Sequence, residues 1–248
     1  MSAAAPELSI IMPAFNEEKR LGRALERIRD YIAKKGFDTE VLVVDDGSSD
    51  GTAELVEEWR ARMPNLRLVS NDRNHGKGYS VRHGMLEARG HIALFTDADL
   101  SAPIEEADKL LAALNEAEIA IGSRALDRSL ISVHQSCFRE LAGTLFNLMV
   151  RLMTGVEFLD TQCGFKAFIR QPAKLIFEQQ RVEGFGFDPE ILFLAKRHGL
   201  RAVEIPVRWA HDPATKVNVF RDSLRMFQDL VRIRCNWLLG RYPKKAGE

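Results

Sequence analysis

Short, almost continuously apolar segments alternate with amphipathic stretches through the first half of the chain, and this alternation constrains its fold most strongly. The apolar segments are residues 8–12, 41–44, 66–69, 92–95 and 118–122. Such segments are typical of strands buried on both faces. The stretches between them have helical periodicity and cover residues 17–35, 51–63, 77–88 and 103–115. The alternation predicts an α/β fold, in which helices flank a mostly parallel sheet and ligands bind at the carboxyl ends of its strands.

Composition excludes several other classes of protein. The 248 residues are 46% hydrophobic and 28% charged, which is ordinary for a soluble globular chain. Cys137, Cys163 and Cys235 are far apart and form no CxxC motif, so neither a disulfide framework nor a zinc site is indicated. Residues 1–120 carry 15 basic and 22 acidic side chains, whereas residues 121–248 carry 20 and 13. The first half therefore suits a metal and the second half suits anions.

Two aspartates follow the fourth apolar segment in the stretch LFTDADLSAP. In a strand, residues i and i+2 leave on the same face, so Asp97 and Asp99 can direct their carboxylates at one point. A divalent cation such as Mg²⁺ or Mn²⁺ would relieve their repulsion and leave room for phosphate oxygens. A DxD motif alone is also compatible with a solvated turn or a helix cap.

Polar motifs follow the other apolar segments too. Asn16 in PAFNE is placed to cap the next helix, and in DDGSSDGT we expect Gly47 in a turn and Asp50 or Ser49 as a helix cap. Capping leaves Asp46 unexplained, and a carboxylate there commonly recognises a base or ribose in nucleotide-binding folds. In NDRNHGKGYS the glycines allow close backbone approach to a ligand beside the charge of Lys77, although a plain glycine turn fits equally well.

Together these motifs carry a family resemblance that none carries alone. PAFNE, DDGSSDGT, HGKG and DADLS, with GSR at residues 122–124, resemble the nucleotide-sugar domain of inverting family 2 glycosyltransferases, whose fold is called GT-A. DTQCGFKAF, VEGFGFDPEILFLA and EIPVRW, followed by Lys216, resemble the dolichyl-phosphate and polyprenyl-phosphate glycosyltransferases, most closely the dolichyl-phosphate β-glucosyltransferase branch. The resemblance covers roughly residues 8–239.

The resemblance implies a role for particular residues. Asp97, Asp99 and Ser101 would hold Mg²⁺ or Mn²⁺, with the hydroxyl of Ser101 the weakest ligand and equally well explained as a cap. Arg124 and Arg139 would grip the phosphate of the lipid acceptor and, with Asp97 and Asp99, form the catalytic set. The donor would be bound by Pro13, Ala14, Asn16, Glu17, Asp46, Lys77, Asp97 and Lys216.

The implied reaction moves a hexose, glucose from UDP-glucose, to the phosphate of a polyprenyl or dolichyl phosphate. A lipid phosphate monoester has a second pKa of about 6, so it reaches the site charged and needs no general base. GDP-mannose remains an alternative donor. A soluble hydroxyl acceptor with Asp188 as base is a second alternative, and an inactive membrane-binding module is a third. Asp188 and Glu190 suit a sugar pocket, whereas Asp188 ahead of Pro189 equally suits a helix cap.

The end of the chain suggests contact with a membrane surface. Phe220, Leu224, Phe227, Val231 and Leu238 recur at helical spacing among many arginines, and Trp237 lies among leucines. A terminal helix packed on the sheet explains this pattern as well as an interfacial helix does. We expect a catalytic domain over residues 1–212, divided into donor (8–123) and acceptor (124–212) halves, and a membrane-surface helix over 213–248. No apolar stretch of about 18 residues is present, so a cytoplasmic protein bound peripherally to the inner face of the membrane is expected.

Overall fold

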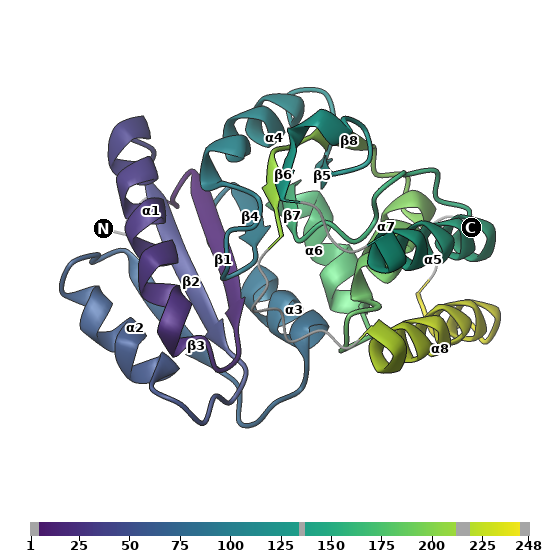
Figure 1. Ribbon diagram of the computed structural model, residues 1–248, viewed down its shortest axis with the longest axis horizontal. Helices are drawn as coiled ribbons and strands as arrows, with labels where there is room; N and C mark the ends of the chain where they lie inside the picture. Colours follow the sequence, from purple (N-terminus) through teal and green to yellow (C-terminus); the bar gives the residue numbers. More distant parts are fainter. Residues whose placement is uncertain (1–4, 134–136, 212–218, 244–248) are drawn as a thin grey trace.

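A computed structural model describes residues 5–133, 137–211 and 219–243. Its centre is a seven-stranded sheet in the order β3-β2-β1-β4-β7-β5-β8, which Figure 1 shows between layers of helices. The strands are β1 (Leu8–Ala14), β2 (Thr39–Asp45), β3 (Leu66–Ser70), β4 (Ile92–Thr96), β5 (Ile119–Ser123), β7 (Phe165–Ile169) and β8 (Ala202–Pro206). The five predicted strands are therefore confirmed, each within three residues at either end.

One strand of this sheet runs against the others. β1, β2, β3 and β4 pair in parallel, and β5 pairs in parallel with β8, but β7 lies antiparallel between β4 and β5. The turn that precedes β7 therefore reaches the same edge of the sheet as the segments that follow β4 and β5. Segments from both halves of the sequence therefore meet at that edge. The predicted mostly parallel sheet did not indicate which later segment would reach it.

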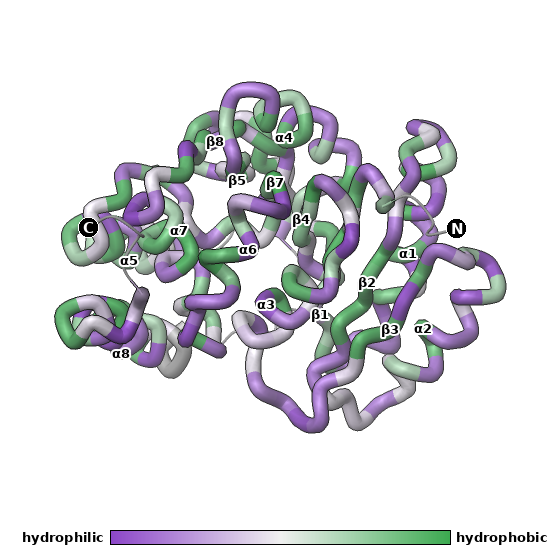
Figure 2. Tube along the Cα trace, turned by 180° about the vertical axis from the view of Figure 1, so that it is seen from behind, coloured by the Kyte–Doolittle hydropathy of each residue, from purple (hydrophilic) through white to green (hydrophobic). Residues whose placement is uncertain are grey.

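Helices cover both faces of the sheet. α1 (Glu18–Lys35), α2 (Thr52–Arg60) and α4 (Ala107–Ala113) share one apolar core with the sheet. The second core joins the opposite face of the strands to α3 (Lys77–Glu87), α5 (Cys137–Thr154), α6 (Arg170–Gln179), α7 (Phe187–Arg197) and α8 (Val219–Leu238). In Figure 2 the central strands are coloured mainly as hydrophobic, as expected for strands buried on both faces. A short helix, η1 (Ile104–Glu106), precedes α4, and a second, η2 (Arg128–Leu130), follows β5.

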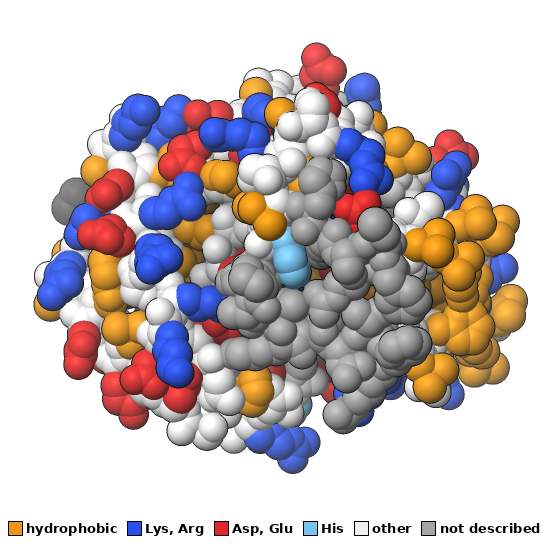
Figure 3. Space-filling view, in the orientation of Figure 1, with side chains coloured by type: hydrophobic (Ala, Val, Ile, Leu, Met, Phe, Trp, Pro, Cys, Tyr) orange, Lys and Arg blue, Asp and Glu red, His pale blue; other side chains and the backbone are white. Residues whose placement is uncertain are grey.

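Helices α5 and α8 pack against each other and expose apolar side chains. α8 directs Leu230 and Ile233 into the second core but leaves Leu224 and Leu238 exposed. We call the exposed apolar side chains of these helices the apolar face: Leu141, Leu145, Leu148, Leu152, Leu224, Phe227, Val231 and Leu238. Figure 3 shows hydrophobic side chains gathered at the edge where α5 and α8 lie. Within the described ranges, no helix is long and apolar enough to cross a membrane.

A small second sheet forms in the second half of the chain. β6 (Ile131–Val133) pairs in parallel with β9 (Trp209–Ala210), beyond the end of β8. This pairing brings Trp209 beside the segment that follows β5. The side chain of Trp209 thereby reaches the site described next.

Candidate active site

The acidic pair lies just beyond β4. The strand ends at Thr96, so Asp97 and Asp99 belong to the turn that follows it. The i, i+2 spacing had predicted both residues within the strand itself. The turn includes Leu100 at a φ of 47°. Burial raises the pKa of the Asp99 carboxyl, and the charge of Asp97 raises it further. The two carboxylates are thus close enough to repel each other, which is the arrangement expected of a cation site.

The possible metal ligands of this turn fit a magnesium or manganese ion that a substrate would help to hold. Asp97 and Asp99 offer carboxylate oxygens, the ligands that these hard cations prefer. No cluster of three or more acidic, histidine or cysteine ligands exists among the described residues. Such a pair suits Mg²⁺ or Mn²⁺ when phosphate oxygens complete the coordination. Ser101 donates its backbone N–H to Asp99 Oδ1 at 2.9 Å, so it orients Asp99 whether or not its hydroxyl binds metal.

A glycine turn brings a lysine to the same place. Lys77, the first residue of α3, places its Nζ 2.6 Å from Asp97 Oδ1. Burial lowers the pKa of Lys77, but Asp97 and Asp188 outweigh burial and raise it above its ordinary value. Gly76 has a φ of 114°, and an added Cβ would lie 2.7 Å from the carbonyl oxygen of Glu183. The turn therefore needs glycine to deliver a charged ammonium beside the acids.

Asp46 holds that turn from below. Its Oδ2 accepts the Gly76 N–H at 2.8 Å, and its Oδ1 accepts the His75 N–H at 3.1 Å and the Asn71 side-chain amide at 2.7 Å. The carboxylate is 3% exposed. Asp46 thus shapes the lysine turn, a function that the motif did not reveal. His75 Nε2 lies at hydrogen-bond distance, 2.6 Å, from Asp72 Oδ1, and its ring stacks on that of Tyr79 with 4.2 Å between centroids.

The remaining predicted donor residues lie at the carboxyl end of β1. Asn16, at a φ of 54°, does not cap α1; its Oδ1 instead accepts the Ser49 N–H at 2.8 Å, joining the loops after β1 and β2. The N-cap of α2 is Gly51 and not Ser49 or Asp50 as predicted, although Asp50 Oδ1 accepts the Thr52 N–H at 3.1 Å beside it. Glu17 pairs with Arg20. Pro13 and Ala14 end β1, and Gly47 has the expected positive φ of 71°.

Arg124 is held rigidly at the end of β5. Its Nε and Nη2 donate to the two oxygens of Asp160 at 2.6 and 2.8 Å, and its guanidinium lies 5.3 Å from the ring centroid of Trp209. Burial lowers the pKa of Arg124, but Asp160 raises it by more, so the group stays charged. The fork to Asp160 leaves Nη1 and one Nη2 hydrogen for another oxyanion.

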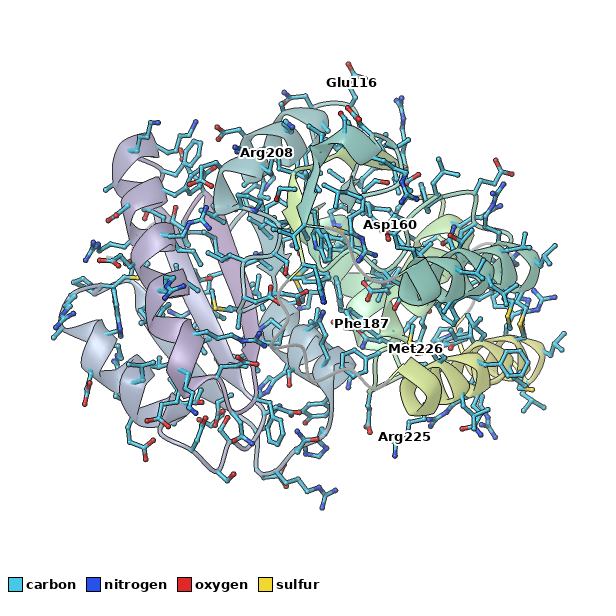
Figure 4. The ribbon with its side chains drawn as sticks, viewed as in Figure 1. Glu116, Asp160, Phe187, Arg208, Arg225 and Met226 are labelled. Atoms are coloured by element: carbon cyan, nitrogen blue, oxygen red, sulfur yellow. The ribbon has the colours of Figure 1, made fainter. Side chains whose placement is uncertain are left out.

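These groups line one pocket of about 390 Å³. The lining includes Lys77, Asp97, Asp99, Ser101 and Arg124, together with residues of α5 and α8, namely Ala142, Gly143, Phe146, Asn147, Ser223 and Met226. Figure 4 labels Asp160 and Met226, which line it from the turn before β7 and from α8. Pro13, Ala14, Asn16, Glu17 and Asp46 are not among its lining residues. The pocket therefore joins the acids to the helices that carry the apolar face.

Two predicted site residues cannot be placed. Lys216 lies outside the described residues, and Arg139 belongs to α5 but its side chain is not described. Asp188 lines the pocket, whereas Glu190 accepts hydrogen bonds from Val182 N–H and the Tyr242 hydroxyl outside it.

Sequence reasoning assigned no role to Asp160 or Trp209. The motif DTQCGFKAF contained Asp160, but only the structure pairs it with an arginine 36 positions earlier.

Asp188 makes a buried ion pair with Lys166 Nζ at 2.5 Å, and burial raises the pKa of its carboxyl despite that lysine.

Comparison with known sequences gives consistent results. A family model described as Glycosyl transferase family 2 matches residues 9–174. A dolichyl-phosphate beta-glucosyltransferase of Drosophila melanogaster is 38% identical over 249 residues, which cover 94% of this chain and 76% of that protein. One of Trichomonas vaginalis is 37% identical over 91% of this chain and 72% of its own length, and that of Homo sapiens is 34% identical over 94% and 76%.

Solved structures share the fold at lower identity. Mannosyl-3-phosphoglycerate synthase from Rubrobacter xylanophilus superposes with a TM-score of 0.65 at 21% identity, covering 97% of this chain and 77% of that one. Glucosyl-3-phosphoglycerate synthase from Mycobacterium tuberculosis, in complex with Mn²⁺ and UDP-glucose, gives a TM-score of 0.63 at 21% identity, with coverages of 97% and 80%. The mostly parallel sheet flanked by helices is thus the GT-A arrangement.

Proposed function

The chain belongs to glycosyl transferase family 2 and is a glycosyltransferase, and from that premise we propose that it transfers glucose from UDP-glucose to the phosphate of a dolichyl or polyprenyl phosphate. The relatives named above as dolichyl-phosphate beta-glucosyltransferases support this acceptor and this sugar. The glucosyl-3-phosphoglycerate synthase that was solved with Mn²⁺ and UDP-glucose supports the same kind of donor and metal.

One observation carries the proposal: a single pocket contains groups suited to each part of the two substrates. Lys77, Asp97 and Asp99 are suited to a metal-bound diphosphate, and Arg124 is suited to a phosphate monoester. Phe146 of α5 and Met226 of α8 also line the pocket, and these two helices expose the apolar face. A soluble acceptor would give no reason for eight apolar side chains to remain exposed beside the site.

The chemistry follows from these positions. An oxygen of the lipid phosphate attacks the anomeric carbon, the bond to the diphosphate breaks, and the nucleoside diphosphate leaves from the opposite face, so the anomeric configuration inverts. Mg²⁺ or Mn²⁺ would neutralise the diphosphate as it leaves. Arg124, fixed by Asp160, holds the attacking phosphate in line, and Lys77 donates to the diphosphate. The nucleophile arrives charged, so no side chain needs to remove a proton from it.

The apolar face is the proposed contact with the membrane. Leu141, Leu145, Leu148 and Leu152 follow one side of α5 and are 48% to 77% exposed. Arg225, Arg232 and Arg234 are exposed on α8 beside Leu224 and Leu238, which adds charge complementary to anionic headgroups. Trp237 contributes less than its sequence position suggested, because Arg197 lies 3.8 Å from its ring centroid and Phe193 packs against it. A membrane surface would present a prenyl phosphate to the part of the pocket that α5 and α8 line.

The test is a transfer assay with purified full-length protein in detergent. UDP-glucose and GDP-mannose are each offered with Mg²⁺ or Mn²⁺ and with dolichyl phosphate, undecaprenyl phosphate, 3-phosphoglycerate or no acceptor. We expect glucosyl phosphoprenol from UDP-glucose as the main product, with its formation abolished by EDTA. Mannose transfer to the lipid would show that GDP-mannose is the donor. Transfer to 3-phosphoglycerate would show that the acceptor is soluble and not a lipid. The absence of both transfer and hydrolysis would favour an inactive membrane-binding module.

A further inference from the structure

One buried donor beside the reacting groups has no hydrogen-bond partner. Nε2 of Gln162 is buried and unpaired within the described part of the chain, and Gln162 lines the pocket. In the same part of the chain the buried Oε1 of Gln180 also lacks a hydrogen-bond partner, but Gln180 does not line the pocket. A buried amide left unsatisfied costs about 1–3 kcal/mol, so folded proteins rarely keep one without a ligand or water to accept from it.

The turn around Gln162 is fixed at several points. Its backbone N–H donates to Asp160 Oδ1 at 3.2 Å, and the neighbouring Thr161 hydroxyl donates to Asn147 of α5 at 3.0 Å. Gly164 abuts the metal-site carboxylate so closely that an added Cβ would lie 2.1 Å from Asp97 Oδ2. Gln162 is thus held between Asp160, the partner of Arg124, and Gly164, the neighbour of Asp97.

This position lies where the transferred group must sit. The acceptor phosphate is held by Arg124 and the donor diphosphate is held at Asp97 and Asp99, so the hexose bridges the gap between them. The groups beside it that suit phosphate are cations, Arg124 and Lys77. A neutral amide is less suited to a phosphate than these are, but it matches a hydroxyl, which accepts a hydrogen bond and can return one.

Building on the proposed function, we propose that Gln162 donates from Nε2 to one hydroxyl of the transferred hexose and so helps to select the sugar. A site that pairs a buried polar group with a substrate hydroxyl discriminates strongly against an analogue that lacks the hydroxyl, because the amide is again left unpaired. Gln162 is therefore a specificity-determining residue, and the metal and the acceptor phosphate do not depend on it.

The experiment compares Gln162→Met and Gln162→Glu with the wild-type protein. Met keeps the length of the side chain without polar hydrogen, and Glu keeps its shape but loses the donor. Activity is measured as kcat/KM with UDP-glucose and with its 2-, 3-, 4- and 6-deoxy analogues, and binding of UDP-glucose and of UDP is measured by calorimetry. Thr161→Val is the matched control, since it alters the same turn but removes a hydroxyl already committed to Asn147.

For one deoxy analogue we expect the wild-type protein to lose about 10- to 100-fold in kcat/KM. Gln162→Met should lose a similar factor with UDP-glucose and almost nothing more with that analogue, because the variant and the analogue remove the same hydrogen bond. Thr161→Val should keep the wild-type discrimination between UDP-glucose and that analogue. Affinity for UDP, which has no hexose, and KM for the lipid phosphate should both stay unchanged in the Gln162 variants.

Additive losses with every analogue would overturn the proposal. A fall in UDP affinity would assign Gln162 to the diphosphate, and a raised KM for the lipid would assign it to the acceptor. The calorimetric comparison needs no turnover: if transfer to lipid fails but Gln162→Met still weakens UDP-glucose and not UDP, only the proposed function is lost. If the wild-type protein binds neither UDP-glucose nor GDP-mannose, both proposals are wrong.

Discussion

The carboxyl edge of β1 to β4 and the outer face of α5 and α8 differ in what they leave exposed to solvent. At the strand edge, Asp46 is 3% exposed and each oxygen accepts hydrogen bonds from the lysine turn. On the helices, Leu141 and Leu152 are 69% and 77% exposed although both are apolar. Water is a poor solvent for such side chains, at about 25 cal/mol for each Å² exposed.

The proposed function assigns a different substrate to each region. Buried, hydrogen-bonded charges keep a fixed geometry for a soluble anion. Exposed rows of leucines lower the free energy of the system when they leave water, as contact with a membrane surface would allow. The pocket joins the two regions, so each can be altered while the other is measured.

The largest effect is expected at the strand edge. Asp99→Ala should reduce metal-dependent transfer by at least about 10³-fold, because half of the carboxylate pair is lost. Folding stability should hold or rise, since repulsion from Asp97 disappears. Transfer is measured with a titration of Mn²⁺, and unfolding is measured by urea. Glu54→Ala on the exposed side of α2 is the control, and equal turnover of Asp99→Ala and wild type, or of wild type in excess EDTA, would refute a metal role.

Arg124→Lys should cost about 10²-fold in kcat/KM for the lipid. Lysine keeps the charge but loses the fork to Asp160 and the contact with Trp209, so the phosphate is no longer held in line. The affinity for UDP-glucose should change little, which would separate acceptor binding from donor binding. Arg23→Lys on α1 is the matched exposed control. A variant that loses donor affinity as well would show that the two regions are not independent.

Replacing Leu145 and Leu148 by glutamate should weaken binding to anionic liposomes by about tenfold or more, because two charges would enter the apolar layer. Cosedimentation at several salt concentrations measures this, and binding of the wild type should weaken as salt rises. Transfer to a short, soluble prenyl phosphate should persist. Point substitutions test this contact better than a deletion of α8 would, because α8 also fills the second core with Leu230 and Ile233. Wild-type protein that ignores anionic liposomes at low salt would refute membrane contact.

Asp188→Asn should reduce kcat by less than about tenfold, well below the effect of Asp99→Ala. The asparagine oxygen still accepts from Lys166, and no proton must be removed from a phosphate nucleophile. The rate is measured per folded molecule across pH, and its acidic limb should follow the lipid phosphate, with a pKa of about 6. A loss on the order of 10³-fold would instead favour a hydroxyl acceptor with Asp188 as its base.

The smallest effect concerns stability in acid. Burial raises the pKa of Asp160, but Arg124 outweighs it and holds the pKa below its ordinary value. The folded state therefore binds this proton less readily than the unfolded state, so the contribution of the pair is present above about pH 4 and is lost as pH falls toward the folded pKa. Urea unfolding between pH 3 and 7 should show a shallower loss of stability for Asp160→Asn than for the wild type. Parallel curves would show that Asp160 contributes nothing to this dependence.

Much of the structure of residues 8–123 could be predicted from the sequence. Its strands are continuous apolar runs and its helices have clear periodicity, so β1 to β5 and the helices between them were located with small errors at their ends. The GT-A fold and the family also followed from the motifs. The acids followed from their position after a strand, although they lie in a turn.

The contacts that the later part of the chain makes could not be predicted to the same depth. Arg124 meets Asp160 only because β7 reverses direction and Trp209 arrives through a two-residue strand, and neither event leaves a periodic signal. Asp46 had several plausible partners, and only the fold shows that it holds the turn at Gly76. The sequence also did not determine whether Leu224 and Leu238 are exposed, because a packed helix and an interfacial helix share one pattern.

The antiparallel strand also bears on how the chain folds during synthesis. β4 ends at residue 96, but its second neighbour, β7, begins at residue 165, and β5 lacks β8 until residue 202. Until β7 has been synthesised the growing chain exposes an unpaired edge on β4, a site at which nascent chains can associate wrongly. We therefore expect residues 1–123, produced alone, to aggregate, and coexpression with residues 124–248 to restore soluble protein.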